Sequence, residues 1–517
     1  MNYSLLLFCL VFNLFSFGQS FIRTELPTVL SSPWEITYGP DGYLWISEKN
    51  GTIARVDPFT GSKNIVYTAS EYFPGSPSEQ LTLCHTPMIG AGTMGLALHP
   101  DFLINDSSFL YLFYSYNAGT ALNPKTSFKI ARIKWDSALQ TAGNETTILE
   151  NIPSGYDHLG GRLLAVKQAN RNFLYVSIGD HGISEDNSPG CYIPSESNPN
   201  NFTQHPDSLN GKILRLNLNG SVPYDNPIPG NPMFTRGHRN PQGFAFNSEK
   251  ELVYDIEHGD RTDDELNLLK AGMNYGWKTV RGFPEDESFP NEATVYANYT
   301  PHPLIANDRL VSPIFSWCTV PPPPGSPNSD WCTVAPSDGI YYGNKAIHQW
   351  KNSVLVTTLK DGTTTDKSVH LIRLSEDGTS LCNSTLLPNH EILFAEDQSL
   401  NGRLRDITLS PDGRTVFLIN NGGTDRDKIT VYHYNPSADL LESELLMFPN
   451  PASTNLYFTA AVKLKQIQIF DSVGKLVWTL ESEDITGISI SSLSDGVYSI
   501  LALGEDQIKR IAQFIKK

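Results

Sequence analysis

The chain of 517 residues is short of basic charge, because 38 Lys and Arg stand against 55 Asp and Glu and give a formal net charge of −17. Nucleic-acid binding needs clustered positive charge that neutralises phosphates, so nucleic acid is not expected as a partner. Long hydrophobic runs are scarce as well. Beyond the first 20 residues no apolar run approaches the roughly 20 residues of a membrane-spanning helix, so we expect no transmembrane segment in the mature chain.

The single long apolar run covers residues 5–17 and ends in small and polar residues from Ser16 to Ser20. A run of this length at the start of a chain is typical of a secretory signal peptide, although no Lys or Arg precedes it. We therefore predict a signal peptide over residues 1–19 and export of the mature protein.

Cysteine is also sparse, and the whole chain holds six: Cys9, Cys84, Cys191, Cys318, Cys332 and Cys382. Removing the signal peptide leaves five, so at least one thiol stays unpaired. An exported chain can keep disulfides. Cys318 and Cys332 form the predicted pair, because each stands in a Trp-Cys-Thr-Val tetrapeptide at one end of a Pro- and Gly-rich segment. The pairing of the other three stays open.

Glycine and proline are abundant and punctuate runs in which apolar and polar residues alternate. Alternation with period two between turn signals predicts antiparallel β-strands. The unit recurs six times, starting at Trp34, Met94, Gly160, Gln242, Gly339 and Arg405. A unit of three or four strands repeated at long spacing predicts an all-β fold, a six-bladed β-propeller over residues 20–438. A stack of β-sandwiches is the alternative.

A titratable pair stands just before the third repeat, in GYDHLGGRLLAV from Gly155. His158 titrates near neutrality and can take a proton from a substrate hydroxyl. Asp157 adjoins it, but neighbours on a strand point to opposite faces. Asp180, at the end of the next predicted strand, is therefore the better candidate to fix the tautomer of the imidazole. A surface histidine at a blade edge is the alternative.

Cations gather in later repeats. Arg239 and Asn240 open the fourth repeat in GHRNPQGF, and a guanidinium can fork onto a carboxylate or quinone oxygen, or form a salt bridge between blades. Arg403 and Arg405 are two residues apart and share one face of a strand, while Lys360 stands at the corresponding strand end of the fifth repeat. Three cations on one face predict a polyanionic ligand, with scattered solvated charges as the alternative.

An acidic turn follows in IEHGDRTDDELNLL, where Asp263, Asp264 and Glu265 offer oxygen ligands suited to calcium. Gly259 leaves a backbone carbonyl open to an ion. The spacing fits no standard calcium loop, so a solvated acidic turn is the alternative.

Short motifs follow one another in fixed order between about Pro33 and Pro436: LWISEKNGTIARV, GLALHPDF, DHLGGRL, IGDHG, LNGKILRLNLNGS, GHRNPQGFAF, HGDRTDDELNLL, NYGW, WCTVAP and RLRD. In this order they resemble the soluble pyrroloquinoline quinone (PQQ) dependent glucose dehydrogenases and aldose sugar dehydrogenases of the glucose/sorbosone dehydrogenase family. The resemblance implies a six-bladed propeller that passes hydride from C1 of an aldose to the quinone and yields a lactone.

The resemblance also implies a role for each matching residue. His158 would be the general base, with Asp180 orienting it, Arg239 as the third catalytic residue and Asp157 in the substrate site. The implied PQQ-binding residues are Arg239, Asn240, Trp331, Thr333, Lys360, Arg403 and Arg405. The cofactor's calcium would take the backbone carbonyls of Gly259 and Asp260, and Glu265 and Tyr275 match ligands of a separate structural calcium.

Three positions depart from the family pattern. Gly90 stands where a Gln or Glu usually contacts the sugar, which leaves the sugar preference open. Asp260 replaces the usual proline at the calcium turn, and Asn421 replaces an aspartate found in some members.

The last part of the chain has a different pattern, which predicts a small β-sandwich over residues 442–517. Its motifs PNPASTNL, LSDGVYSI and KRIAQFIKK resemble the C-terminal sorting domain of proteins exported by the type IX secretion system. The resemblance implies that machinery as a partner and a location outside the cell or on its surface, reached through the periplasm. A structural or sugar-binding β-sandwich is the alternative.

We therefore expect a secreted sugar dehydrogenase with PQQ and Ca²⁺ as cofactors, an aldose as substrate and an external electron acceptor. One rival is a propeller that only binds a ligand or partner. The other is a calcium-dependent lactonase, which would need side-chain carboxylates and amides around the central channel. No such ring is evident in the sequence.

Overall fold

The computed structural model describes residues 21–76, 90–155, 157–181, 202–286, 290–320, 332–360, 365–384, 387–422, 427–435, 445–459, 462–472, 475–505 and 509–517. None of the helices in these ranges is long and apolar enough to cross a membrane. The predicted signal peptide, Cys84, Cys191 and Trp331 lie outside the described residues. Internal contacts divide the chain into residues 23–432 and a second unit that includes residues 433–517. The predicted boundaries at residues 19, 438 and 442 stay predictions.

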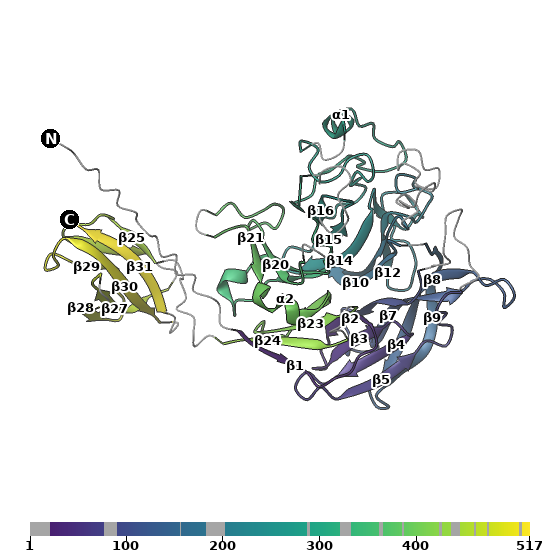
Figure 1. The fold of residues 1–517 in the computed structure, drawn as a ribbon, viewed down its shortest axis with the longest axis horizontal. Helices are drawn as coiled ribbons and strands as arrows, with labels where there is room; N and C mark the ends of the chain where they lie inside the picture. Colours follow the sequence, from purple (N-terminus) through teal and green to yellow (C-terminus); the bar gives the residue numbers. More distant parts are fainter. Residues whose placement is uncertain are drawn as a thin grey trace, which may run out of the picture. The chain divides into compact units, whose positions relative to one another are not determined.

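The described residues up to 435 form six four-stranded sheets, one for each predicted repeat (Figure 1). The first two hold β2 (Pro33–Tyr38), β3 (Leu44–Glu48), β4 (Thr52–Val56) and β5 (Lys63–Thr68), then β6 (Thr93–Leu98), β7 (Phe109–Asn117), β8 (Thr126–Asp136) and β9 (Thr141–Pro153). The next two hold β10 (Gly160–Gln168), β11 (Arg171–Ile178), β12 (Lys212–Asn217) and β13 (Met233–Arg236), then β14 (Asn240–Asn247), β15 (Leu252–His258), β16 (Asp264–Leu268) and β17 (Phe315–Trp317).

The fifth sheet holds β18 (Pro336–Tyr342), β19 (Ser353–Thr358), β20 (Val369–Arg373) and β21 (His390–Leu393). The sixth holds β22 (Leu404–Leu409), β23 (Thr415–Asn420) and β24 (Ile429–Tyr434), and β1 (Phe21–Glu25) completes it from the other end of the chain. Short helices are α1 (Glu292–Ala297), α2 (Gln398–Asn401) and the 3₁₀ turns η3 (His348–Trp350) and η4 (Ala395–Asp397).

The sheets close into a ring. Their first strands contact one another in the order β2, β6, β10, β14, β18 and β22, and β22 contacts β2 again. Pairing within sheets is antiparallel where β10 meets β11 and β11 meets β12, which confirms the predicted strand type. A closed ring of such sheets is a β-propeller. The pairing of β1 with β24 places the first and last strands of the ring in one sheet.

The predicted alternation of buried and exposed positions is wrong for many inner strands. Every residue of β3 and of β16 is buried. The reason is that neighbouring sheets pack face to face, as where Phe113 and Phe128 of the second sheet share a core with Val176 and Leu214 of the third. Both faces of these strands are therefore inside the protein.

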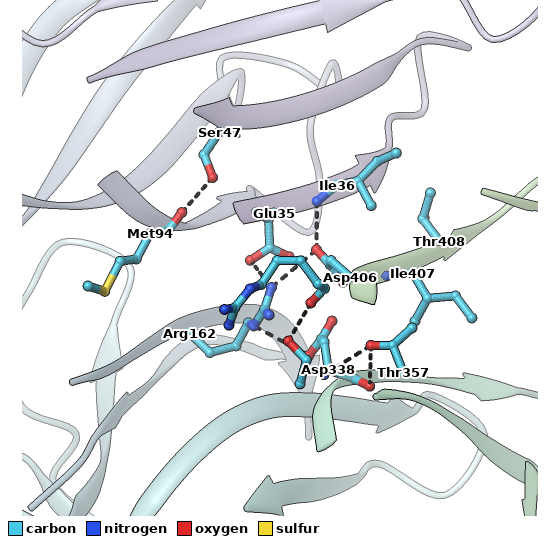
Figure 2. Close-up of polar contacts among 12 residues, drawn as sticks. Glu35, Ile36, Ser47, Met94, Arg162, Asp338, Thr357, Asp406, Ile407 and Thr408 are labelled. Carbon is cyan, nitrogen blue, oxygen red and sulfur yellow. Dashed lines mark hydrogen bonds and ion pairs between the residues drawn. The ribbon is translucent and has the colours of Figure 1, made fainter. Parts of the chain in front are cut away.

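Four charged residues meet at the centre of the ring, and we call Glu35, Arg162, Asp338 and Asp406 the central cluster (Figure 2). Each lies at a β-bulge of a first strand, in β2, β10, β18 and β22. A bulge redirects the side chain at that position. The four strands thereby aim one guanidinium and three carboxyl groups at a common point.

Arg162 pairs with all three acids. Its Nη1 lies 2.6 Å from Glu35 Oε2 and 3.1 Å from Asp406 Oδ2, and its Nε lies 3.3 Å from Asp338 Oδ1. The ring of Trp34 covers the guanidinium, with its centroid 4.1 Å from Cζ. Burial raises the pKa of Glu35 and of Asp338 well above the usual range, and Arg162 offsets this only in part.

The central cluster corrects one expectation from the sequence, which showed no ring of carboxylates at the channel. The ligand oxygens of Glu35, Asp338 and Asp406 lie within 4.8 Å of one another. However, the guanidinium of Arg162 already occupies the position among them that a cation would take. The ring exists, but it is built as an internal salt-bridge network.

The C-terminal unit has two sheets. One holds β25 (Leu446–Phe448), β26 (Asn455–Thr459) and β29 (Gly487–Ser489), and the other holds β28 (Leu476–Glu481), β27 (Leu464–Phe470), β30 (Gly496–Gly504) and β31 (Lys509–Lys516). Leu456 of the first sheet and Ile467, Ile500 and Phe514 of the second share one core. In β30 the burial does alternate, as the sequence predicts for a sheet with one face in solvent.

Candidate active site

The structure brings His158 and Asp180 together. His158 precedes β10 and has a positive φ of 48°, which is unusual for a residue with a side chain. Asp180 follows the end of β11, and its Oδ1 lies 2.8 Å from His158 Nδ1. Both residues are buried. Since a carboxylate only accepts hydrogen bonds, Nδ1 carries the proton when the ring is neutral, and Nε2 is then the nitrogen that can accept one.

The substrate candidate Asp157 is exposed to solvent. Its Oδ1 accepts a hydrogen bond from the backbone N–H of His158 at 2.8 Å, and its Oδ2 lies 4.0 Å from His158 Nε2. Asp157 and the Nε2 atom therefore face the same space. This is the arrangement that the prediction requires of a residue in contact with substrate.

Gly90 lies beside this pair, and its neighbour explains the missing side chain. The carbonyl of Gly90 accepts a hydrogen bond from Ser154 Oγ at 2.6 Å. A Cβ atom added to Gly90 would lie 2.4 Å from Leu159 Cδ1. Leu159 therefore fills the volume that a Gln or Glu at this position would use, and it places an apolar group next to His158.

Arg239 and Asn240 lie next to the histidine pair, at the start of β14. The backbone N–H of Asp180 donates to the carbonyl of Arg239 at 2.7 Å. Arg239 Nη1 donates to the carbonyl of His258 at 3.4 Å, and Asn240 Nδ2 lies 3.4 Å from His258 Nδ1. Burial and the nearby Arg239 cation hold the pKa of His258 well below its usual value, so its ring is neutral.

Lys360, Arg403 and Arg405, here called the cation cluster, come from two neighbouring sheets. Arg403 Nε donates to the carbonyl of Leu359 at 3.3 Å, which places it beside Lys360. Arg405 lies in the bulge of β22 and donates to Gln242 Oε1 at 3.0 Å. Burial, Arg403 and Arg162 together lower the pKa of Arg405 to about 9. An anion bound here would relieve this unfavourable charge.

Thr333 is half-buried and follows the disulfide between Cys318 and Cys332, whose Cα atoms are 5.5 Å apart. The predicted disulfide is thus confirmed. Cys382 is a free thiol.

The two residues after Thr333 fix its segment. The backbone N–H groups of Val334 and Ala335 both donate to Asp264 Oδ2, at 2.6 and 3.1 Å. This carboxylate fixes the segment that carries Thr333.

The four metal candidates line one pocket. Its walls include Arg239, Glu257, His258, Gly259, Asp260, Asp263, Glu265, Tyr275 and Trp277. Tyr275 Oη donates to the carbonyl of Leu268 at 2.6 Å. Asp260 Oδ2 pairs with Arg281 Nη1 at 2.8 Å. Among the described residues, the carbonyls of Gly259 and Asp260 accept no hydrogen bond.

The chemistry of this pocket fits a cation. Burial, followed by Glu257, raises the pKa of Glu265 well above its usual value. Three buried oxygens nearby have no hydrogen-bond partner in the described part of the chain: Asp255 Oδ1, Asp263 Oδ2 and Asn267 Oδ1. His238 supplies one positive charge, since Glu257 and Asp255 outweigh burial and raise its pKa to about 9. Hard oxygen ligands in excess of positive charge suit calcium.

Three residues of the site have no role in the predictions from sequence. Gln242 joins two cofactor candidates, because it accepts from Arg405 and donates through Nε2 to Asn240 Oδ1 at 2.7 Å. His258 lies between Arg239 and Asn240. Trp277 contacts Asp180. Each falls inside a quoted motif (RNPQG, EHG or NYGW), but a motif does not show which side chains meet.

Together, the fold and the site define a β-propeller with a buried histidine–carboxylate pair, His158 and Asp180. Arg239 lies next to this pair. The chain belongs to the glucose/sorbosone dehydrogenase family, which it matches over residues 30–428, as the sequence motifs indicate. Residues 446–517 match the secretion system C-terminal sorting domain family, which confirms the second resemblance.

Relatives with curated names support this placement. Quinoprotein glucose dehydrogenase B of Acinetobacter calcoaceticus is 30% identical over 79% of this chain and 88% of its own length. Aldose sugar dehydrogenase YliI of Escherichia coli is 26% identical over 66% of this chain and 77% of its own. The PQQ-bound aldose sugar dehydrogenase from Streptomyces coelicolor shares the fold, with a TM-score of 0.54 and 24% identity over 80% of this chain and 99% of that one.

Proposed function

We propose that the chain is a PQQ- and calcium-dependent dehydrogenase that oxidises the C1 hydroxyl of an aldose to the lactone. The observation that carries the proposal is the pair of His158 and Asp180, hydrogen-bonded at 2.8 Å and joined through the backbone of Asp180 to Arg239. A base whose tautomer is fixed thus lies beside a cofactor candidate, in a chain that belongs to a sugar dehydrogenase family.

The proton and the hydride of the substrate take different routes. The C1 hydroxyl gives its proton to Nε2 of His158, because Nδ1 is held by Asp180. The hydrogen on C1 leaves as hydride, and PQQ, when bound, supplies its acceptor. Asp180 stabilises the imidazolium that forms. An external acceptor, which the chain does not identify, must then remove two electrons per lactone.

The cation cluster fits the carboxylates of PQQ. Nε of Arg405 is buried and has no hydrogen-bond partner in the described residues, although its Nη1 is held by Gln242. Guanidinium groups bind carboxylates in a fork geometry that leaves few donors unused. Arg239, Asn240, Trp331 and Thr333 would complete the binding site, and the carbonyls of Gly259 and Asp260 would hold the cofactor's calcium.

The second calcium is proposed for Glu265 and Tyr275, which line the same pocket. Tyr275 Oη is engaged by the backbone at Leu268 and Lys270, so its carbonyl is the atom available to an ion. The excess of buried carboxylates around Glu265 supports this site.

The substrate class follows from the space beside His158. Gly90 offers no side chain to a sugar hydroxyl, and Leu159 presents an apolar surface there. We propose an aldose, as a monosaccharide or as the reducing end of an oligosaccharide. Among the described residues, Asp157 is our candidate to accept a hydrogen bond from it.

The architecture and location complete the proposal. Each four-stranded sheet of the ring would be one blade of a six-bladed propeller, and the two C-terminal sheets would form a β-sandwich. The sorting-domain match supports export by the type IX machinery to the surface or medium, and the signal peptide would direct the first step through the periplasm.

The rival functions lack a supporting observation. A lactonase would need a metal at the central ring, where Arg162 pairs with the carboxylates. A propeller that only binds a ligand has no use for a buried histidine fixed by a carboxylate.

The experiment is reconstitution of the purified mature chain with PQQ and Ca²⁺, followed by dye-linked oxidation of a panel of mono- and oligosaccharides. Aldose oxidation that depends on both additions is the expected result. His158→Ala should lower kcat by roughly 10²- to 10⁴-fold without loss of PQQ binding, while His348→Ala, at an exposed position, should behave as wild type. No PQQ binding would overturn the assignment, and binding without oxidation would overturn the substrate.

A further inference from the structure

Trp277 is hydrogen-bonded to the carboxylate that fixes His158. Its indole N–H donates to Asp180 Oδ2 at 2.8 Å, while Asp180 Oδ1 lies 2.8 Å from His158 Nδ1. All three side chains are less than a tenth exposed. The two oxygens of Asp180 therefore have separate partners, so the orientation of the carboxylate depends on both.

The indole is held by a different part of the fold from the pair it contacts. Trp277 follows β16, whereas His158 and Asp180 flank β10 and β11. The backbone N–H of Trp277 donates to the carbonyl of Gly237 at 2.9 Å. Its own carbonyl accepts from Thr203 Oγ1 at 2.9 Å and from Gln204 Nε2 at 2.7 Å. These bonds fix the backbone of Trp277 independently of the histidine pair.

Two guanidinium groups restrain the indole ring. Cζ of Arg281 lies 5.0 Å from the ring centroid, and Cζ of Arg239 lies 5.5 Å from it. Arg281 is itself held by Asp260 at 2.8 Å. Cation–π contacts at these distances favour one ring position. Asp260, which replaces the usual proline of the family, thus restrains the indole through Arg281.

We propose that Trp277 is a positioning residue for the catalytic base. While its N–H holds Oδ2, Oδ1 stays on Nδ1 of His158, and Nε2 keeps the lone pair that accepts the substrate proton. Without that N–H, the buried carboxylate loses this hydrogen bond, Asp180 can rotate, and the neutral imidazole divides between its two tautomers. The catalytic part of this inference rests on the proposed function; the effect on the tautomer does not.

The kinetic test compares Trp277→Phe with Trp45→Phe in the reconstituted enzyme. Trp45 is a matched control, because its buried indole N–H also donates to an aspartate, Asp41 Oδ1, at 3.1 Å, outside the site. Trp277→Phe should lower kcat about 10-fold, which corresponds to about 1.4 kcal/mol, the scale of one hydrogen bond. The KM should change little, because the lost N–H contacts Asp180 and not the nitrogen of His158 that faces the substrate, and Phe keeps an aromatic ring against Arg239 and Arg281. Trp45→Phe should leave kcat unchanged.

The second test needs no cofactor. In histidine-labelled apo-protein at a pH where imidazole is neutral, ¹⁵N shifts report the tautomer, and His158→Gln identifies the resonance of His158. Wild type and Trp45→Phe should show the proton on Nδ1, and Trp277→Phe should show a mixture. An unchanged tautomer in Trp277→Phe would overturn the inference, whatever the kinetics. If the tautomer shifts but wild type oxidises no sugar, the positioning role holds and the proposed function fails.

Discussion

Two charge clusters meet on β22, where the half-buried Arg405 belongs to the cation cluster and the next residue, Asp406, belongs to the buried central cluster. In the central cluster one guanidinium pairs with three carboxyl groups at 2.6 to 3.3 Å. In the cation cluster, Arg405 forms no ion pair within the described residues, and its polar partner is the neutral amide of Gln242. Adjacent residues therefore serve clusters of opposite character.

The difference in ion-pair partners distinguishes charged residues that stabilise the fold from charged residues that are available to bind a ligand. Burying an ion costs free energy unless a partner is buried with it. Arg162 has its partners inside the chain, and they raise its pKa even though burial lowers it. Burial, together with the neighbouring cations Arg403 and Arg162, lowers the pKa of Arg405 to about 9. A half-buried cation such as Arg405, which has no ion-pair partner among the described residues, is the better indicator of an anion-binding site.

The largest expected effect comes from Arg162→Met. The substitution leaves three buried carboxyl groups without their cation, and the loss of one partner of a buried pair typically costs 3–5 kcal/mol. We expect the free energy of unfolding to fall by about that amount, measured by denaturant unfolding of the apo-protein.

The control for Arg162→Met is Arg171→Met, which removes an exposed pair with Asp225 at 3.1 Å. A surface pair contributes at most about 1 kcal/mol. If the two substitutions cost the same, the central cluster is not a structural network, and the contrast with the cation cluster fails.

Arg405→Met should show the opposite pattern. Removing a cation that lies beside Arg403 should leave the stability of the apo-protein unchanged or slightly higher. Binding of PQQ should weaken by roughly 10- to 100-fold, because hydrogen bonds to charged groups contribute about 1.5–3 kcal/mol. Denaturant unfolding and a PQQ titration measure the two effects on one preparation.

A loss of apo-protein stability in Arg405→Met comparable to that in Arg162→Met would contradict this reading. Unchanged PQQ affinity would do so as well, since Arg405 would then stabilise only the fold.

Gln242→Ala offers a finer test of the same site, because it removes the amide that holds Arg405 and Asn240 and leaves every cation in place.

Much of the fold could be predicted from sequence, because strand alternation and turns are local. The six repeats correspond to six four-stranded sheets, and the Cys318–Cys332 disulfide follows from a repeated tetrapeptide. The central cluster could not be predicted, because its four residues come from four strands and become neighbours only when the ring closes. No local pattern marks Glu35 as a partner of Arg162.

The candidate site divides in the same way. His158 and Asp180 could be paired from the ends of two successive strands. Trp277 could not be added, because it reaches Asp180 from another sheet. Gly90 showed a missing side chain, but only the structure shows that Leu159 fills the space. Contacts within one repeat are readable from the sequence, and contacts between repeats need the packed ring.

The pH dependence of stability sharpens the comparison between the two clusters. Burial raises the pKa of Glu35 in the folded state above the value of about 4.3 expected when unfolded. Above that pH the unfolded chain loses this proton while the folded chain keeps it. The free energy of unfolding therefore falls as pH rises, by about 1.4 kcal/mol per pH unit until the folded pKa is reached.

The substitution Glu35→Gln removes the titrating group and with it this decline in stability. Its stability relative to wild type should therefore increase from pH 5 to pH 7, whereas Glu249→Gln, at an exposed position, should follow wild type. If the difference in unfolding free energy between Glu35→Gln and wild type stays constant with pH, Glu35 is ionised beside Arg162 throughout. The central cluster would then carry an excess of negative charge, just as the cation cluster carries an excess of positive charge.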